Sequence, residues 1–170
     1  MAIKVINAIL WRSYLAATSS ALWGLDNSQY YIELTGTDFD PFFGVTSAQS
    51  TDERGNKAFT VKLEDFDGSN PTDPYDLKVI KLRDGVARAG NYQVLGQRES
   101  QAYPLWQSKR GPQKPYQEMD SEERSKNFMV VVRDSDGLFH ARWIRPEDFA
   151  ALPQSIQALL VSKSVGWSEV

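Results

Sequence analysis

The sequence predicts a mainly β fold with short helices: a largely antiparallel, open β-barrel (pseudobarrel) of about seven strands, flanked by two or three short helices. Short runs of β-branched and aromatic residues recur between turn-rich stretches. An Asp-Gly turn separates two of these runs, and strands do not alternate with helices as in doubly wound folds. A chain of 170 residues can bury one sizeable core, so we expect a single domain over residues 1–170.

The strands are expected at intervals along the whole chain. Residues 3–16 fit both a strand and a helix face, and that element stays open. The hairpin signal is the clearest, because Asp134-Ser135-Asp136-Gly137 lies between two β-rich runs. Composition and period-two alternation predict strands over residues 30–34, 59–63, 76–82, 92–95, 128–133 and 138–144.

Turn residues and prolines predict what lies between and after the strands. Residues 17–29 and 65–74 are dense in Gly, Ser, Asn, Asp or Pro and are expected to form loops. Residues 99–125 contain prolines and aromatic residues, which predicts an ordered loop. Pro146 and Pro153 fit the first turns of helices and Gly166 fits a stop, so we expect the chain to end in one or two short helices.

The composition excludes several kinds of chemistry. The chain has no cysteine, one histidine (His140) and no glycine-rich phosphate loop, which argues against zinc sites, a serine triad and P-loop hydrolysis. We expect a structural or surface role for His140. No apolar run is long enough to span a membrane, and the N-terminus does not resemble a signal peptide. The absence of cysteine is compatible with a reducing cytoplasm, and we expect a cytoplasmic, prokaryotic protein.

Acidic residues in the first half are the remaining candidates for catalysis. With Lys62 they could hold Mg²⁺ in a nuclease site, but turn residues are commonly acidic, and we interpret them as solvated loop charges. We therefore expect no catalytic residue, metal or cofactor in this chain. The acidic residues are Asp38, Asp40, Asp52, Glu53, Glu64, Asp65 and Asp67.

The charge is unevenly distributed along the chain, although its formal net value is only −3. Residues 1–77 hold five Lys/Arg against eleven Asp/Glu, whereas residues 78–114 hold eight against two. A cluster of cations on loops at one edge of a β fold can neutralise DNA phosphates, and Arg and Asn can contact base edges. Small residues around Arg83, Arg88 and Asn91 keep that loop slim enough for the major groove.

A resemblance supports the DNA-binding interpretation. It rests on the run from Arg88 to Gly96, the loop to Pro104-Leu105, the strand 128–133, the Asp-Gly hairpin and a closing helix. This order resembles the DNA-binding pseudobarrel domain shared by plant auxin-response-type transcription factors and the N-terminal effector domains of type II restriction endonucleases that cut CCWGG-like sites. The resemblance covers residues 76–165 in pattern.

The resemblance implies two loop arms that hold double-stranded DNA in its major groove. The N-terminal arm would fall in residues 13–29 and the C-terminal arm in residues 81–91. It also implies a longer parent protein whose separate nuclease domain uses Mg²⁺, and of which this chain is the N-terminal, non-catalytic part. With the neighbouring cations, the expected DNA-binding residues are Arg12, Ser19, Ser20, Trp23, Asp26, Asn27, Lys81, Arg83, Arg88, Asn91, Arg98, Lys109 and Arg110.

Three alternative functions stay open. A protein that recognises modified or flipped bases would need an aromatic-lined pocket, for which Tyr103, Trp106 and Tyr116 are candidates. A protein-interaction domain would use the acidic first half and an apolar patch over residues 22–25. An enzyme would depend on the carboxylates and Lys62. Trp23 and Trp106 could stack on bases, but we favour a role as core or loop anchors.

Overall fold

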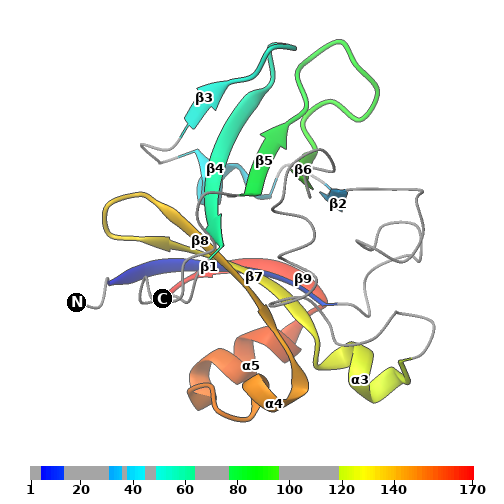
Figure 1. Cartoon of the computed structure of the whole chain (residues 1–170), viewed down its shortest axis with the longest axis vertical. Coiled ribbons are helices and arrows are strands. Elements are labelled where there is room, and N and C mark those ends of the chain that lie inside the picture. The colour runs from blue at the N-terminus through cyan, green and yellow to red at the C-terminus, as the bar shows by residue number, and fades with distance from the viewer. Residues whose placement is uncertain (1–4, 14–30, 36–37, 45–48, 64–76, 96–118) are drawn as a thin grey trace.

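The computed structural model describes residues 5–13, 31–35, 38–44, 49–63, 77–95 and 119–170, and the elements of these residues are shown in Figure 1. The strands are β1 (Ile6–Ser13), β2 (Tyr31–Leu34), β3 (Gln49–Thr51), β4 (Lys57–Leu63), β5 (Leu77–Lys81), β6 (Tyr92–Leu95), β7 (Phe128–Asp134), β8 (Phe139–Ile144) and β9 (Val165–Glu169). The helices are α1 (Asp40–Phe43), α3 (Ser121–Ser125), α4 (Pro146–Phe149) and α5 (Gln154–Ser162).

All nine described strands belong to one sheet. Its order is β2-β6-β5-β4-β8-β7-β1-β9, with the short β3 paired to β4. Every neighbouring pair is antiparallel except β4 and β8, which are parallel. The sheet curls into a nearly closed barrel, which confirms the predicted fold class. The described part contains more strands than the expected seven, because β3 and β9 were not predicted.

The parallel pair joins two halves of the barrel. Val61 lies opposite Phe139, Lys62 opposite His140 and Leu63 opposite Ala141. In Figure 1, β4 and β5 rise steeply from a layer formed by β8, β7, β1 and β9. The interior between the two halves is therefore lined from both sides, and one core serves the whole barrel.

Helix α1 fills one side of this interior with two aromatic rings. Phe42 and Phe43 are both fully buried. The Phe43 ring is stacked on the Tyr92 ring with centroids 4.7 Å apart, and its centroid lies 5.3 Å from those of Phe59 and Phe139. These contacts connect α1 to β4, β6 and β8, so α1 packs on strands from both halves.

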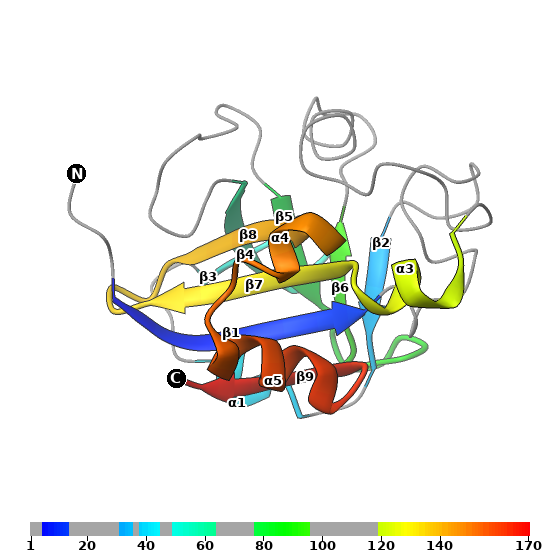
Figure 2. The ribbon, with the colours of Figure 1, turned by 90° about the horizontal axis from the view of Figure 1, so that it is seen from below.

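A second apolar cluster covers the outer face of β1 and β7. Ile9, Val130 and Leu160 of α5 belong to it, and Phe149 of α4 packs against it. Figure 2 shows α4 and α5 lying on this face of the sheet. Because the inner face of both strands belongs to the main core, β1 and β7 are buried on both sides. Near-continuous apolar runs are the expected pattern for such strands.

Double burial also explains the open interpretation of residues 3–16. Ala8 and Leu10 face the interior, whereas Ile9 and Trp11 face the helices. Consecutive buried residues match helical spacing as well as strand spacing, and the structure resolves the choice in favour of a strand.

The expectation that the chain ends in helices is wrong. The helix α5 stops at Ser162 and the strand β9 follows, with Val165 and Trp167 packed on the main core. Gly166 is a strand residue paired with Trp11. A Cβ atom at Gly166 would lie 3.0 Å from the Trp11 ring and 2.4 Å from Lys163 Cε. This glycine permits a close approach between strand, ring and lysine; it does not end a helix.

Residues 99–125 include an unpredicted helix. In α3 the Asp120 carboxylate accepts a hydrogen bond from the Glu123 backbone N–H, and the Glu123 side chain accepts one from the Asp120 N–H. This capping box starts the helix without a preceding apolar periodicity. The rest of the predicted loop, residues 99–118, lies outside the described residues.

Replacement of Phe43 by alanine tests the role of α1 in the core. Because Phe43 is fully buried among rings from three strands, Phe43→Ala is expected to lower the free energy of unfolding by about 3–5 kcal/mol. Chemical denaturation would measure the change, with Val161→Ala as control because Val161 is 64% exposed. Equal, small effects of both substitutions would contradict this packing role.

Candidate nucleic-acid interface

The loop between β5 and β6, residues 82–91, projects from the barrel in Figure 1. Its backbone is internally bonded: Leu82 N–H donates to the Asn91 carbonyl and Gly90 N–H donates to the Leu82 carbonyl, each at 2.9 Å. Gly85 and Gly90 adopt φ values of 86° and 88°. Arg88 adopts φ 61°, the one left-handed non-glycine residue in the described part of the chain. Such a conformation is unfavourable for an arginine and persists where surrounding contacts hold it.

A carboxylate on the neighbouring strand β2 contacts this loop. Glu33 Oε2 lies 2.5 Å from Arg88 Nη1, and Glu33 Oε1 accepts a hydrogen bond of 2.9 Å from Asn91 Nδ2. The Glu33 side chain is only 16% exposed, whereas the Arg88 side chain is 52% exposed. Two predicted DNA-binding residues therefore share one carboxylate, and each binds a different oxygen of it.

The negative charge of Glu33 also acts on Arg12. Arg12 is a half-buried residue near the end of β1. Burial lowers the pKa of its guanidinium, and the negative charge of Glu33 partly offsets that effect. Glu33, which was not predicted as a site residue, thus contacts the predicted residues Arg88 and Asn91, and its charge also acts on Arg12.

Lys81 has a structural partner. Its Nζ lies 2.9 Å from Asp40 Oδ1, which also accepts a hydrogen bond of 2.6 Å from the Tyr92 hydroxyl. Hydrogen bonding from Tyr92, and then from Lys81, lowers the Asp40 pKa. Burial, with the adjacent Asp40 charge, raises the pKa of Tyr92. This network holds α1 at the end of β5, so Lys81 is already paired within the protein.

Arg83 lies beside a second turn, residues 52–56. The Arg83 N–H donates to Asn56 Oδ1 at 3.0 Å, and Asn56 is 3% exposed. Asp52 in turn accepts hydrogen bonds from the backbone N–H groups of Arg54 and Asn56 at 2.9 and 2.8 Å. These bonds fix the turn and the loop relative to each other.

We call the surface of residues 52–57 and 82–91 the loop face. Its exposed charged residues are four cations, Arg54, Lys57, Arg83 and Arg88, and two carboxylates, Glu53 and Asp84. Neither Arg54 nor Arg83 forms an ion pair with a carboxylate of the described residues. Arg54 was not predicted; the turn residues Asp52 and Gly55 around it are the sequence signal that could have found it.

The ladder of β2 and β6 adjoins the loop 82–91 at one end, whereas residues 14–30, most of the expected N-terminal arm, lie outside the described residues. Tyr31, which follows segment 14–30, pairs with Leu95. Leu34, at the other end of β2, pairs with Tyr92, which follows the loop 82–91. The four residues of β2 separate these ends by about 10 Å. The other predicted site residues, Ser19, Ser20, Trp23, Asp26, Asn27, Arg98, Lys109 and Arg110, lie outside the described residues.

His140 has the structural surroundings expected of it. It is 3% exposed, and its Nε2 lies 2.7 Å from Oδ2 of Asp134, which is 1% exposed. Asp134 Oδ1 accepts hydrogen bonds from the Asp136 and Leu138 N–H groups at 2.8 and 3.1 Å. This pair ties the hairpin turn to β8. Among the residues the structure describes, no three His, Asp or Glu side chains are grouped as a metal site would require.

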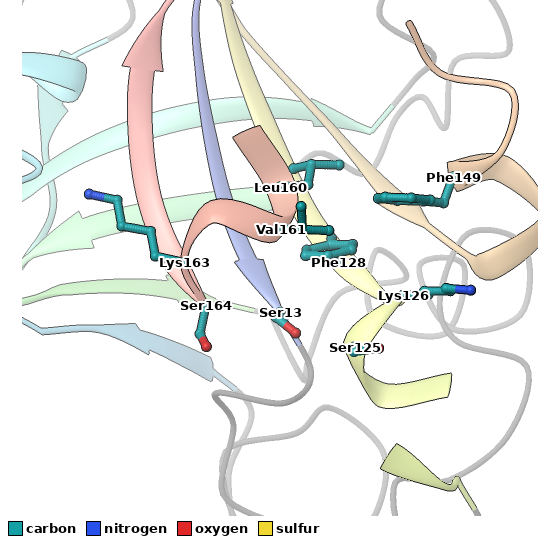
Figure 3. A pocket seen from close by; sticks show the side chains of 9 residues that line it. All are labelled: Ser13, Ser125, Lys126, Phe128, Phe149, Leu160, Val161, Lys163 and Ser164. Carbon is teal, nitrogen blue, oxygen red and sulfur yellow. The ribbon is translucent and has the colours of Figure 1, made fainter. Parts of the chain in front are cut away.

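A pocket of about 360 Å³ lies at the far side of the molecule, between α3, α5 and the ends of β1 and β7. Phe128, Phe149 and Leu160 form its apolar wall, and Figure 3 shows the Lys126 and Lys163 side chains extending away from it. Lys126 pairs with Glu122, and the Ser13 hydroxyl donates to the Arg124 carbonyl. Several polar groups of the lining are therefore bonded within the protein, and the two lysines do not converge on the pocket.

None of the helices described is long and apolar enough to span a bilayer. No protein-family model, curated protein or solved structure matches the chain.

The buried pair predicts acid sensitivity. Burial alone would raise the Asp134 pKa, but hydrogen bonds from His140, Leu138 and Asp136 outweigh it and lower the pKa. A carboxyl whose folded-state pKa lies below its unfolded value stabilises the fold above the unfolded value, about 3.9 for Asp, and loses that contribution as the pH falls further. Asp134→Asn should therefore reduce stability by about 1–3 kcal/mol at pH 7.

Urea unfolding across pH 2–7 would test this expectation. The free energy of unfolding of the unmodified chain should fall more steeply below about pH 4 than that of the Asn variant. Asp136→Asn is the control, because the exposed Asp136 side chain neighbours the same turn. Parallel pH curves for the original chain and Asp134→Asn would show that Asp134 contributes no acid sensitivity.

Proposed function

We propose that this chain binds double-stranded DNA through the loop face. The observation that carries the proposal is the state of Arg88. A half-exposed arginine on a projecting loop is held in an unfavourable backbone conformation by a largely buried carboxylate. Strained residues held by their surroundings are typical of binding sites. A slim loop that carries a guanidinium in a fixed orientation fits the width of the major groove and the acceptor groups of its bases.

The other cations of the loop face suit the DNA backbone. Arg54 and Arg83 are exposed on two turns that Asn56 connects. Cations without a nearby carboxylate partner can neutralise phosphates and release counterions, which is the main source of sequence-independent affinity. Arg54 and Arg83 would therefore position the duplex, while the loop 82–91 enters the groove.

The proposal differs from the two-arm arrangement that the resemblance implies. Residues 14–30 lie outside the described residues, and the contact that we propose is that of the loop face. The wider context is also a proposal: a recognition module of a prokaryotic, cytoplasmic restriction endonuclease, whose Mg²⁺-dependent nuclease domain would be a separate segment.

Fluorescence anisotropy against random and CCWGG-containing duplexes at several salt concentrations would test the proposal. The logarithm of the association constant should fall linearly with that of the salt concentration, by about 0.9 per phosphate contact. Arg83→Ala should reduce this slope by about one contact, whereas Lys163→Ala, which removes an exposed cation beside α5, should leave it unchanged.

A duplex RNA of the same sequence serves as the nucleic-acid control, because its deep, narrow major groove does not admit a protein loop. Lack of DNA binding even at low salt would contradict the proposed function and favour a protein-interaction domain. An equal decrease of the salt slope in Arg83→Ala and Lys163→Ala would contradict the assignment of DNA binding to the loop face.

A further inference from the structure

We infer that Arg88 recognises a guanine base instead of contacting a phosphate, and that Glu33 is the residue that positions it; this inference rests on the proposed DNA binding. Two features of the loop face distinguish Arg88 from its neighbours Arg54 and Arg83. Arg88 alone among these three arginines contacts a carboxylate of the described residues, and it alone has a left-handed backbone.

The carboxylate disfavours a phosphate contact. Glu33 Oε2 lies 2.5 Å from Arg88 Nη1, so the pair has no net charge as seen from outside. A phosphate would meet the repulsion of Glu33 as well as the attraction of Arg88, and the pair would release few counterions. A neutral base edge carries no such repulsion, because it offers acceptor atoms without a formal charge.

The geometry favours guanine among the bases. The five N–H donors of an arginine are arranged as a planar fork, which matches the O6 and N7 acceptors of guanine in the major groove. Half of the Arg88 side chain is exposed, and the contact with Glu33 fixes the direction of the fork. Fixing this direction before binding reduces the entropy that the long side chain would otherwise lose.

Asn91 completes the positioning of the carboxylate. Its Nδ2 donates to Glu33 Oε1, so the two oxygens of Glu33 bind two side chains of one loop. The Asn91 N–H also donates to the Arg88 carbonyl at 3.1 Å. Rotation of Glu33 would break both contacts, and Glu33 is largely buried in the barrel wall. The guanidinium is therefore held by a residue of β2 in addition to its own loop.

The experiment first selects duplexes from a random pool and then replaces each guanine of the enriched site by 7-deazaguanine, which lacks the N7 acceptor and still pairs with cytosine. When the guanine that Arg88 contacts is replaced, the affinity of the unmodified chain for the duplex should fall about 10-fold. Arg88→Lys keeps the positive charge but not the planar fork of donors. This variant should no longer discriminate guanine from 7-deazaguanine, while the dependence of its affinity on salt concentration stays unchanged. Arg124→Lys, on α3 and outside the loop face, is the matched control and should keep both the discrimination and the salt dependence.

Glu33→Gln tests the positioning role. It removes a negative charge near the DNA but retains an acceptor of the same size. Affinity for random duplex should stay equal or rise, whereas the 7-deazaguanine discrimination should fall to about 3-fold or less. A residue that only stabilised the fold would lower both. Circular dichroism would establish that each variant is folded, and Glu33→Asp, which retains the charge, should recover part of the discrimination.

The outcomes separate this inference from the proposed function. If no duplex is bound at low salt, the proposed function fails. If duplexes are bound but the enriched site lacks guanine, or 7-deazaguanine has no effect, or Arg88→Lys retains the discrimination, DNA binding stands and the role assigned to Arg88 is overturned.

Discussion

The parallel pairing of β4 with β8 is the constraint on which the rest of the structure depends. Three residue pairs, from Val61–Phe139 to Leu63–Ala141, join an antiparallel half made of β2, β6, β5 and β4 to one made of β8, β7, β1 and β9. Pairs so distant in sequence carry a chain-entropy cost, which the shared core must offset. The buried rings of Phe42 and Phe43 supply that core from α1, and the interior faces of both halves complete it.

This junction also determines where the loop face lies. The strands β4 and β5 rise from the other half, so their far ends carry the turn 52–56 and the loop 82–91 away from the barrel (Figure 1). The backbone of the loop is held by its own hydrogen bonds, by Asn56 and by Glu33 on β2. A loop bonded at several points to neighbouring strands and turns is a suitable support for a side chain that must be held in one orientation.

Much of the fold could be predicted from local signals. The Asp-Gly hairpin, the period-two strands and the proline-started helices depend on neighbouring residues, and the structure has all of them. The strand β9 could not be found in this way. Its Gly166 looks like a helix stop, and its meaning appears only when Trp11 is placed 3.0 Å from a hypothetical Cβ. The helix α3 depends on a capping box instead of an apolar stripe.

The candidate site likewise contains residues that local sequence could identify and partners that only the fold brings close to them. The basic loop residues could be selected from composition, but their partners could not, because Glu33 and Asp40 precede them by roughly forty to sixty positions in the chain. Those partners change the interpretation. Lys81 holds α1 through Asp40, and Arg88 forms a neutral pair with Glu33, so the cations proposed for phosphate contact are Arg54 and Arg83. A formal net charge of −3 is compatible with such a site, because only its local surface must attract DNA.

The most direct test of the central claim is an NMR titration of the isotope-labelled chain with a short DNA duplex at moderate salt. The account predicts that the largest chemical-shift changes occur at the backbone amides of residues 52–57 and 82–91 and at the side-chain N–H groups of Arg83 and Arg88, with little change in α4, α5 and β9. Changes centred on the helices, or no changes at any duplex concentration, would contradict the assignment of DNA binding to the loop face.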